Sequence, residues 1–198
     1  MTKSRIPVVP FVVSLLIALY GQDIAARSFI NDIRQVDFKN FTFSRSKDKK
    51  GAEVIRFRDG KYVGREGLNY SLMRFAYGDL TGDGREEAVI LLRGQNTPIS
   101  RTLDEVFIYT LENGEVVLLT SFEGGKRGDY ICSVLHSESN FKVEDNLLII
   151  DQAVALEGDN GLIPTRYYTI TYRWDGNRMK EVERSALKPL PEHRREVG

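Results

Sequence analysis

The chain has 198 residues, of which 41% are hydrophobic and 10% aromatic, which is enough apolar material for one folded domain and excludes wholesale disorder. Its 28 basic and 28 acidic residues give a formal net charge of zero, so no basic excess indicates a nucleic-acid or anionic-membrane partner. The single cysteine, Cys132, excludes an intrachain disulfide, so the fold must be held by its core.

The N-terminus has the pattern of a Sec-type signal peptide. Lys3 and Arg5 form a short positive region, and residues 6–20 carry no charge. A membrane-spanning helix needs roughly 20 apolar residues, so a cleaved signal fits this shorter run better than an anchor, although an uncleaved anchor stays the alternative. We expect a signal peptide over residues 1–21, with cleavage as late as residue 26. The mature protein is then secreted or periplasmic, with no stable membrane span.

Residues 30–184 have the pattern of a single β-rich domain. Residues 36–43 are rich in Phe and favour a first strand. Asp59-Gly60 lies between apolar runs and predicts a hairpin, because both central positions of such a turn need a positive φ. Residues 70–77 alternate and predict a strand. This strand would place the following side chains on one face: Met73, Phe75 and Tyr77.

The second half of this region repeats the pattern of strands and tight turns. Residues 88–92 form a continuous apolar run that predicts a central strand buried on both faces. Three further turns are predicted by Asn113-Gly114, Asp145-Asn146 and Asp175-Gly176-Asn177. The predicted fold class is all-β, an antiparallel meander of consecutive hairpins, with a sandwich, a partly closed barrel or propeller-like sheets all remaining open. Residues 185–198 are charged and predict a polar C-terminal tail.

The most informative stretch is an acidic turn between two predicted strands. If Asp79 is position one, side-chain oxygens fall at positions one, three, five and nine, on Asp79, Thr81, Asp83 and Glu87. Gly84 stands where a sharp turn is needed, and the carbonyl of Arg85 could point inward. Ca²⁺ prefers six to eight such oxygens, so the spacing predicts a structural calcium loop. A tight turn closed by local capping, with no metal, remains the alternative.

The acidic turn resembles the calcium loops of FG-GAP and VCBS-type repeats, which occur in integrin α-subunit propellers and bacterial surface proteins. Those loops lie between two strands. The matching residues are Asp79, Asp83, Gly84 and Glu87, while Thr81 departs from the acidic or amide residue expected there. An EF-hand is not indicated, because Ile90 occupies the position of its bidentate Glu.

A looser likeness covers more of the chain. The layout of residues 36–42, the acidic turn, residues 106–114 and residues 172–177 is similar to a group of small exported bacterial proteins of unassigned function. This resemblance implies a cell-envelope setting and supplies no activity.

No catalytic constellation stands out, but a hydrolase with a carboxylate pair remains an alternative. Its candidates by residue type are Glu105, Glu123, Glu157 and Asp159. Cys132 and His136 lie about 13 Å apart on a strand, too far for a nucleophile and its base. A tripeptide at residues 127–129 has the sequence that integrins read on exposed loops.

An aromatic strand near the C-terminus offers a possible ligand surface. Tyr168, Tyr172 and Trp174 share the face that predicts core packing, whereas Tyr167 and Arg173 lie on the face that could meet a ligand. We therefore expect an exported, non-enzymatic β-domain for binding or envelope structure. It would carry one structural calcium ion and bind an unknown protein or polysaccharide.

Overall fold

The computed structural model describes residues 30–44, 54–64, 67–96, 101–124, 130–131, 140–154, 156 and 164–190. Within these ranges the chain is all-β, and its strands pair antiparallel. The exceptions are two short 3-10 turns, η1 (Ile33–Gln35) and η2 (Phe38–Asn40). No helix of these ranges has the length and apolar character to span a membrane. The all-β, antiparallel prediction is confirmed.

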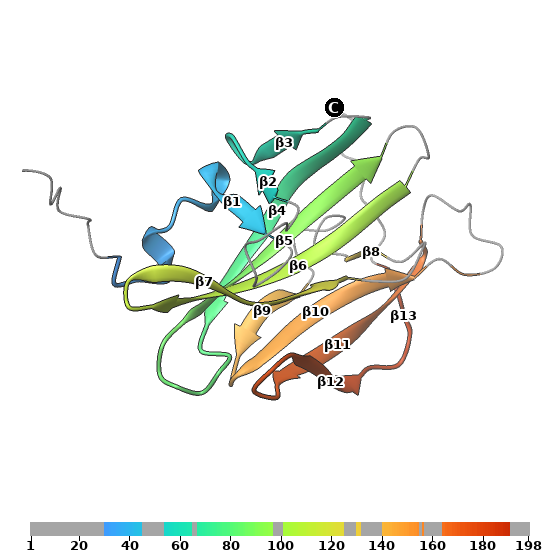
Figure 1. The fold of residues 1–198 in the computed structure, drawn as a ribbon. Helices are drawn as coiled ribbons and strands as arrows, with labels where there is room; N and C mark the ends of the chain where they lie inside the picture. The colour runs from blue at the N-terminus through green and yellow to red at the C-terminus, as the bar shows by residue number, and fades with distance from the viewer. Residues whose placement is uncertain are drawn as a thin grey trace, which may run out of the picture.

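The first large sheet is a five-stranded meander (Figure 1). Its strands follow one another in space as they do along the chain, so each pairs with its sequence neighbours. They are β3 (Lys61–Val63), β4 (Leu68–Gly78), β5 (Glu87–Asn96), β6 (Arg101–Glu112) and β7 (Glu115–Glu123).

The second large sheet has six strands and is centred on β10 and β11. β8 and β9 pair with β10, while β12 and β13 pair with the other side of β11. The bounds are β8 (Tyr130–Ile131), β9 (Phe141–Glu144), β10 (Leu147–Val154), β11 (Arg166–Trp174), β12 (Met179–Arg184) and β13 (Lys188–Pro189).

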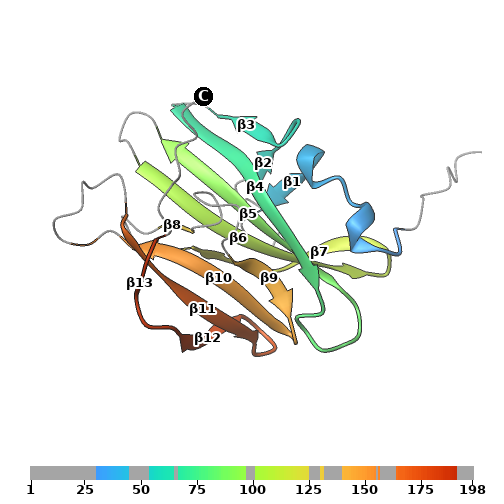
Figure 2. The same ribbon diagram turned by 180° about the vertical axis from the view of Figure 1, so that it is seen from behind.

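The two large sheets share an apolar core. Val89, Leu91 and Ile108 of the first sheet pack in one cluster with Leu148 and Ile150 of the second. All are buried, and both views of the ribbon show the sheets lying against each other (Figures 1 and 2). Neither sheet closes on itself within the described residues, because each strand order ends at separate edge strands.

The opposite face of the five-stranded sheet is covered by the N-terminal part of the chain. β1 (Thr42–Ser44) and β2 (Val54–Arg56) form a small sheet of their own. Phe38, Phe43 and Phe57 pack with Phe107 and Tyr109 in a second buried cluster. Several of these rings meet edge to face, an arrangement that adds to the free energy gained from burial.

The central strands of the five-stranded sheet are buried on both faces, because one apolar cluster covers each face. Residues 88–92 of β5 have no exposed surface, and neither have Val106, Phe107 and Ile108 of β6. The predicted central strand is therefore confirmed.

The predicted tight turns are also present. β6 and β7 are joined by Asn113-Gly114, with φ of 53° and 79°. β9 and β10 are joined by Asp145-Asn146, with φ of 51° and 59°. Asp59-Gly60 makes the expected turn with φ of 50° and 75°, but its flanking strands pair elsewhere, so the turn joins two sheets. One isolated bridge, Arg58 to Lys61, closes it.

The predicted strand at residues 36–43 is wrong over most of its length. The Asp37 side chain accepts hydrogen bonds from the Lys39 amide at 3.1 Å and from Asn40 Nδ2 at 2.7 Å, which closes η2. This turn lets both Phe38 and Phe41 reach the same core cluster, whereas a strand would send alternate rings to opposite sides.

The shared face predicted for β4 is wrong at one residue. Phe75 and Tyr77 pack with the N-terminal layer as expected, but Met73 packs in the core between the large sheets. The pairing of β4 with β5 shifts between Leu72 and Arg74, and this bulge turns Met73 to the other face.

The start of the predicted C-terminal tail belongs to the second large sheet. Lys188 and Pro189 pair with Tyr167 and Arg166 of β11. The sheet therefore continues past residue 184, the expected end of the domain.

Candidate functional site

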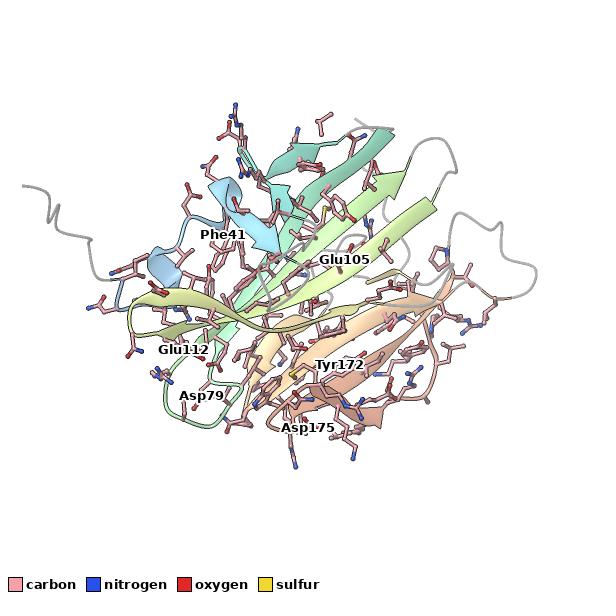
Figure 3. All side chains as sticks on the ribbon, in the orientation of Figure 1. Phe41, Asp79, Glu105, Glu112, Tyr172 and Asp175 are labelled. Atoms are coloured by element: carbon pink, nitrogen blue, oxygen red, sulfur yellow. The ribbon has the colours of Figure 1, made fainter. Side chains whose placement is uncertain are left out.

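The acidic turn joins β4 to β5 and is anchored by an apolar side chain. Leu80 is only 3% exposed and packs in the core between the two large sheets. The turn lies at the end of both strands, where Figure 3 labels Asp79. Burial of Leu80 fixes the first half of the turn against the sheets and contributes about 1.5–3 kcal/mol.

Glu87 is the polar anchor of the turn, and it has no exposed surface. Its Oε2 accepts hydrogen bonds from the backbone amides of Leu80 at 2.8 Å and Thr81 at 3.2 Å. Its Oε1 accepts one from the Thr110 hydroxyl at 3.1 Å. Burial raises the pKa of the Glu87 carboxyl above its ordinary value, and the three donors oppose this rise. The carboxylate thus ties the turn to β5 and β6.

Asp79 organises the tip of the turn. Its Oδ1 accepts a hydrogen bond from the Gly82 amide at 2.6 Å, and its Oδ2 accepts one from the Gly84 amide at 2.9 Å. Both glycines have a positive φ, of 78° and 84°, which presents their amides to the carboxylate. From outside the turn, Asn146 Nδ2 donates to the Asp79 carbonyl at 2.6 Å. The β9–β10 turn therefore holds the acidic turn from the second sheet.

Asp83 is paired with a cation of the same turn. Arg85 donates to it from its backbone amide at 2.9 Å and from Nε at 3.0 Å. Arg85 Nη1 also donates to the Leu111 carbonyl at 2.9 Å. The Arg85 hydrogen bonds lower the pKa of the Asp83 carboxyl. Both side chains are exposed, so the pair adds little to the free energy of unfolding.

The side-chain oxygen of Thr81, a predicted ligand, has no hydrogen-bond partner among the described residues. This atom, Oγ1, is buried. The hydroxyl lies close enough to Asp83 to help Arg85 lower the pKa of that carboxyl. A buried hydroxyl without a partner is uncommon in folded proteins, so this oxygen is a group that a ligand could satisfy if the turn opened.

The five predicted ligands lie in one turn, but their oxygens face different donors. In the part of the chain that the structure describes, no group of three or more His, Cys, Asp or Glu side chains is arranged to hold a metal. Asp83 faces Arg85, and Glu87 faces the backbone and Thr110. Calcium binding therefore stays a prediction. The structure adds three groups that the spacing rule did not indicate: Thr110, Leu111 and Asn146.

Glu86, the residue before Glu87, points away from the core. It forms a two-point ion pair with Arg34, whose Nη2 lies 2.9 Å from Oε1. These hydrogen bonds lower the pKa of the Glu86 carboxyl. Arg34 also lies over the Tyr77 ring, with its central carbon 4.7 Å from the ring centre. The N-terminal layer is thereby tied to the start of β5.

Three further acids are buried among the described residues, and each accepts hydrogen bonds. Asp104 forms a two-point pair with Arg93 at 2.7 Å, directly across β5 and β6. Asp151 accepts from the Asn140 amide at 2.8 Å and from the Thr169 hydroxyl at 2.7 Å. Buried carboxylates with such donors stabilise a sheet and are poorly placed to exchange protons with a substrate.

The third of these acids, Glu105, is a predicted hydrolase residue. It accepts a hydrogen bond from the Tyr70 hydroxyl at 3.0 Å. Its cross-strand partner is Glu123, so the structure brings two of the four candidate acids side by side. The other two, Glu157 and Asp159, lie outside the described residues. Figure 3 shows Glu105 far from the Asp79 end of the sheet, so this pair and the acidic turn are separate.

The aromatic strand contributes to packing, as predicted. Tyr172 lies against Phe122 of β7, with ring centres 5.2 Å apart, and burial raises its pKa to about 12. Tyr168 is covered by Arg184 of β12, whose central carbon lies 4.4 Å from the ring centre. Of the outer face, Tyr167 is half-buried and Arg173 is exposed.

Several earlier candidates fall outside the part of the chain that the structure describes. They are the signal region, Cys132, His136 and the tripeptide at residues 127–129. They stay predictions from the sequence. No protein-family model matches the chain, and comparisons with characterised proteins and with solved structures found no match either.

Proposed function

We propose that this protein is an exported, non-enzymatic β-domain that serves in binding or in cell-envelope structure. The supporting observation is that its buried carboxylates are occupied by hydrogen bonds. All four that are buried in the described ranges accept hydrogen bonds from protein groups. A general acid or base needs a carboxyl group within hydrogen-bond reach of substrate, and these four are turned inward.

The finer architecture that we propose is a sandwich with an added layer. Its support is the apolar cluster shared by the two large sheets, together with the N-terminal cluster on the other face of the first. Such a three-layered body offers rigid surfaces, which suits a protein that binds a protein or polysaccharide partner.

Calcium binding by the acidic turn is a second part of the proposal. Asp79 can keep its bonds to the Gly82 and Gly84 amides, because each carboxylate oxygen has a second lone pair. Thr81 brings a hydroxyl with no partner among the described residues. Asp83 has a lone pair left on Oδ1, but the Arg85 guanidinium is bonded to its Oδ2, and this positive charge opposes the approach of a cation. We therefore expect calcium to compete with Arg85.

Glu87 is the least available of the predicted ligands. Three protein donors hold it inside, and removing it would leave the amides of Leu80 and Thr81 without an acceptor. A calcium site that keeps this anchor would consist of Asp79, Thr81, Asp83 and the Arg85 carbonyl, completed by water. With so few protein ligands, binding would be weak, in the millimolar range typical of low-affinity sites.

The alternative is a hydrolase that uses the Glu105–Glu123 pair. Directly paired residues on an antiparallel sheet have Cβ atoms about 4.5–5.5 Å apart. A retaining glycosidase needs carboxyl groups about 5–5.5 Å apart, so this register places the two candidate acids within a suitable range.

An activity assay separates the two functions. The purified protein is incubated with cell-wall and extracellular polysaccharides, and released reducing ends are measured. Our proposal predicts no release above the buffer blank. Release that is lost in both Glu105→Gln and Glu123→Gln, but kept in Glu115→Gln, would establish the hydrolase instead. Glu115 is a matched control because it also faces an acid, Glu112, across β6 and β7.

A further inference from the structure

Asp151 is a buried acid of β10 whose carboxylate is held by two residues of the described ranges. It is only 4% exposed. The backbone amide of Asn140 donates to its Oδ2 at 2.8 Å, and Asn140 Nδ2 donates to Oδ1 at 3.1 Å and to Oδ2 at 3.0 Å. The Thr169 hydroxyl donates to Oδ1 at 2.7 Å. A hydroxyl and a carboxamide therefore meet at one carboxylate oxygen inside the protein.

The hydroxyl of Thr169 is placed to act as a nucleophile. An alcohol is a weak nucleophile until a base takes its proton, and that base must lie within hydrogen-bond reach, about 2.6–3.2 Å. Asp151 Oδ1 meets this condition. Burial keeps the carboxyl away from a dissolved substrate, but the hydroxyl belongs to the chain itself. The same burial excludes the water that would compete with the hydroxyl.

The side chain of Asn140 supplies the matching electrophile. Its Cγ is a carbonyl carbon, and the group that would leave from it, Nδ2, bonds to the same Oδ1 as the Thr169 hydroxyl. An amide nitrogen leaves readily only when it gains a proton. A carboxyl that bonds to both groups can take the proton from one and give it to the other.

The backbone around these three side chains holds them in place. Asp151 and Thr169 are direct cross-strand partners in β10 and β11. The Ser185 amide donates to the Thr169 carbonyl at 2.9 Å, and the Ser185 hydroxyl accepts from the Thr169 amide at 2.9 Å. The Asn140 carbonyl accepts from the Asp151 amide at 2.9 Å. Groups that a fold holds together react far faster than the same groups free in solution.

We propose that Thr169 and Asn140 condense into an intramolecular ester, with Asp151 as the proton relay. A bond forms between Thr169 Oγ1 and Asn140 Cγ, and the bond between Cγ and Nδ2 breaks. The hydroxyl proton moves to Asp151 and from there to Nδ2, which leaves as ammonia. The reaction consumes no other reactant.

The ester would give this chain a covalent cross-link that its cysteine content does not allow. Cys132 is the only cysteine, so no disulfide can form within the chain. The ester would join β11 to the residue just before β9 and close the loop between them, which restricts the unfolded chain. This inference depends on neither calcium binding nor export.

Mass spectrometry of the mature wild-type protein tests the proposal. We expect the intact mass to be about 17 Da below that of the sequence, because one ammonia is lost. After proteolysis, the peptides that contain residues 140 and 169 should appear as one linked species. A wild-type protein with its full mass overturns the proposal. A loss of ammonia confined to a single peptide overturns it too, because that loss arises without a cross-link.

Variants separate the chemistry from the fold. Thr169→Val removes the nucleophile and Asp151→Asn removes the base, so both should have their full mass. Thr169→Ser keeps a hydroxyl and should still lose ammonia. Thr171→Val is the matched control, because it changes the next threonine of β11, whose β10 partner is Ile149, and it should behave as the wild type. A linked species that persists in Thr169→Val would contradict the assignment.

Discussion

Glu86 and Glu87 are neighbours in sequence, but they titrate in opposite environments. Glu86 lies on the surface against Arg34, and its pKa is lowered from the ordinary value of 4.5. Glu87 is buried beneath the acidic turn, and its pKa is raised from the same value. A carboxyl with a lowered pKa adds stability above its unfolded pKa, and this is lost as the pH falls through the folded pKa. One with a raised pKa adds stability at low pH, which is lost as the pH rises through the folded pKa.

The first prediction is that Glu86→Gln and Glu87→Gln change the pH dependence of stability with opposite signs. The difference in unfolding free energy, variant minus wild type, should become more negative for Glu86→Gln as the pH rises through 4.5. For Glu87→Gln the same difference should become more positive over the range above 4.5, since the variant no longer buries a charge. Urea unfolding at a series of pH values, with a chelator present, measures both.

Equal slopes for the two variants would show that Glu87 is not held in a buried environment. A glutamine at this position can still accept from the Leu80 and Thr81 amides and donate to the Thr110 hydroxyl, so the comparison changes the charge and keeps the hydrogen bonds.

At the scale of elements, β4 and β9 meet at a point that has no room for a side chain. A Cβ added to Gly78 would lie 2.6 Å from Cγ1 and 2.8 Å from Cβ of Val143. This close approach brings the end of β4, just before the acidic turn, onto the second sheet. The contact depends on the absence of a side chain, because overpacked cores force neighbouring groups to shift.

The second prediction is that substitutions at Gly78 and Val143 have coupled effects on the free energy of unfolding. Gly78→Ala should lower the unfolding free energy by about 1–3 kcal/mol. Val143→Ala removes the methyl group at 2.6 Å but keeps the Cβ at 2.8 Å, so it relieves part of the clash and the double variant should lose less than the sum of the single losses. Thermal or urea unfolding of the four proteins gives the coupling energy. Additive losses would mean that the two sheets do not touch at this point.

The turns between elements are the part of the fold that the sequence predicts best. Asn-Gly and Asp-Asn pairs take up positive φ, a local property, and they form the β6–β7 and β9–β10 turns as expected. The strand predicted at residues 36–43 is wrong, because the turn there is stabilised by contacts of its Phe side chains with β5 and β6, which are distant in the chain. The bulge at Met73 likewise depends on pairing between strands and has no signal in the sequence.

At the scale of the whole molecule, the acidic turn is where three parts of the chain meet. Its spacing predicts that the oxygens of five residues converge on one ion, whereas in the structure these residues lie in one turn and face different donors. Their partners could not be predicted. Thr110, Leu111 and Asn146 come from β6 and from the β9–β10 turn, and only the register of the sheets brings them to the turn. The sequence thus indicates where the acidic turn is, and the tertiary structure decides which donors its oxygens face.

Donors of the protein close the turn, and we expect calcium to enter it by displacing the Arg85 side chain. Thermal melting of the wild type and of Arg85→Ala, each in millimolar calcium and in chelator, tests it most directly, with Arg184→Ala as a control that also loses an arginine paired with an acid. An ion at ten times its dissociation constant stabilises the folded state by about 1.4 kcal/mol. Calcium should raise the melting temperature of Arg85→Ala more than that of the wild type or the control. Equal melting temperatures with calcium and with chelator in all three proteins would contradict it.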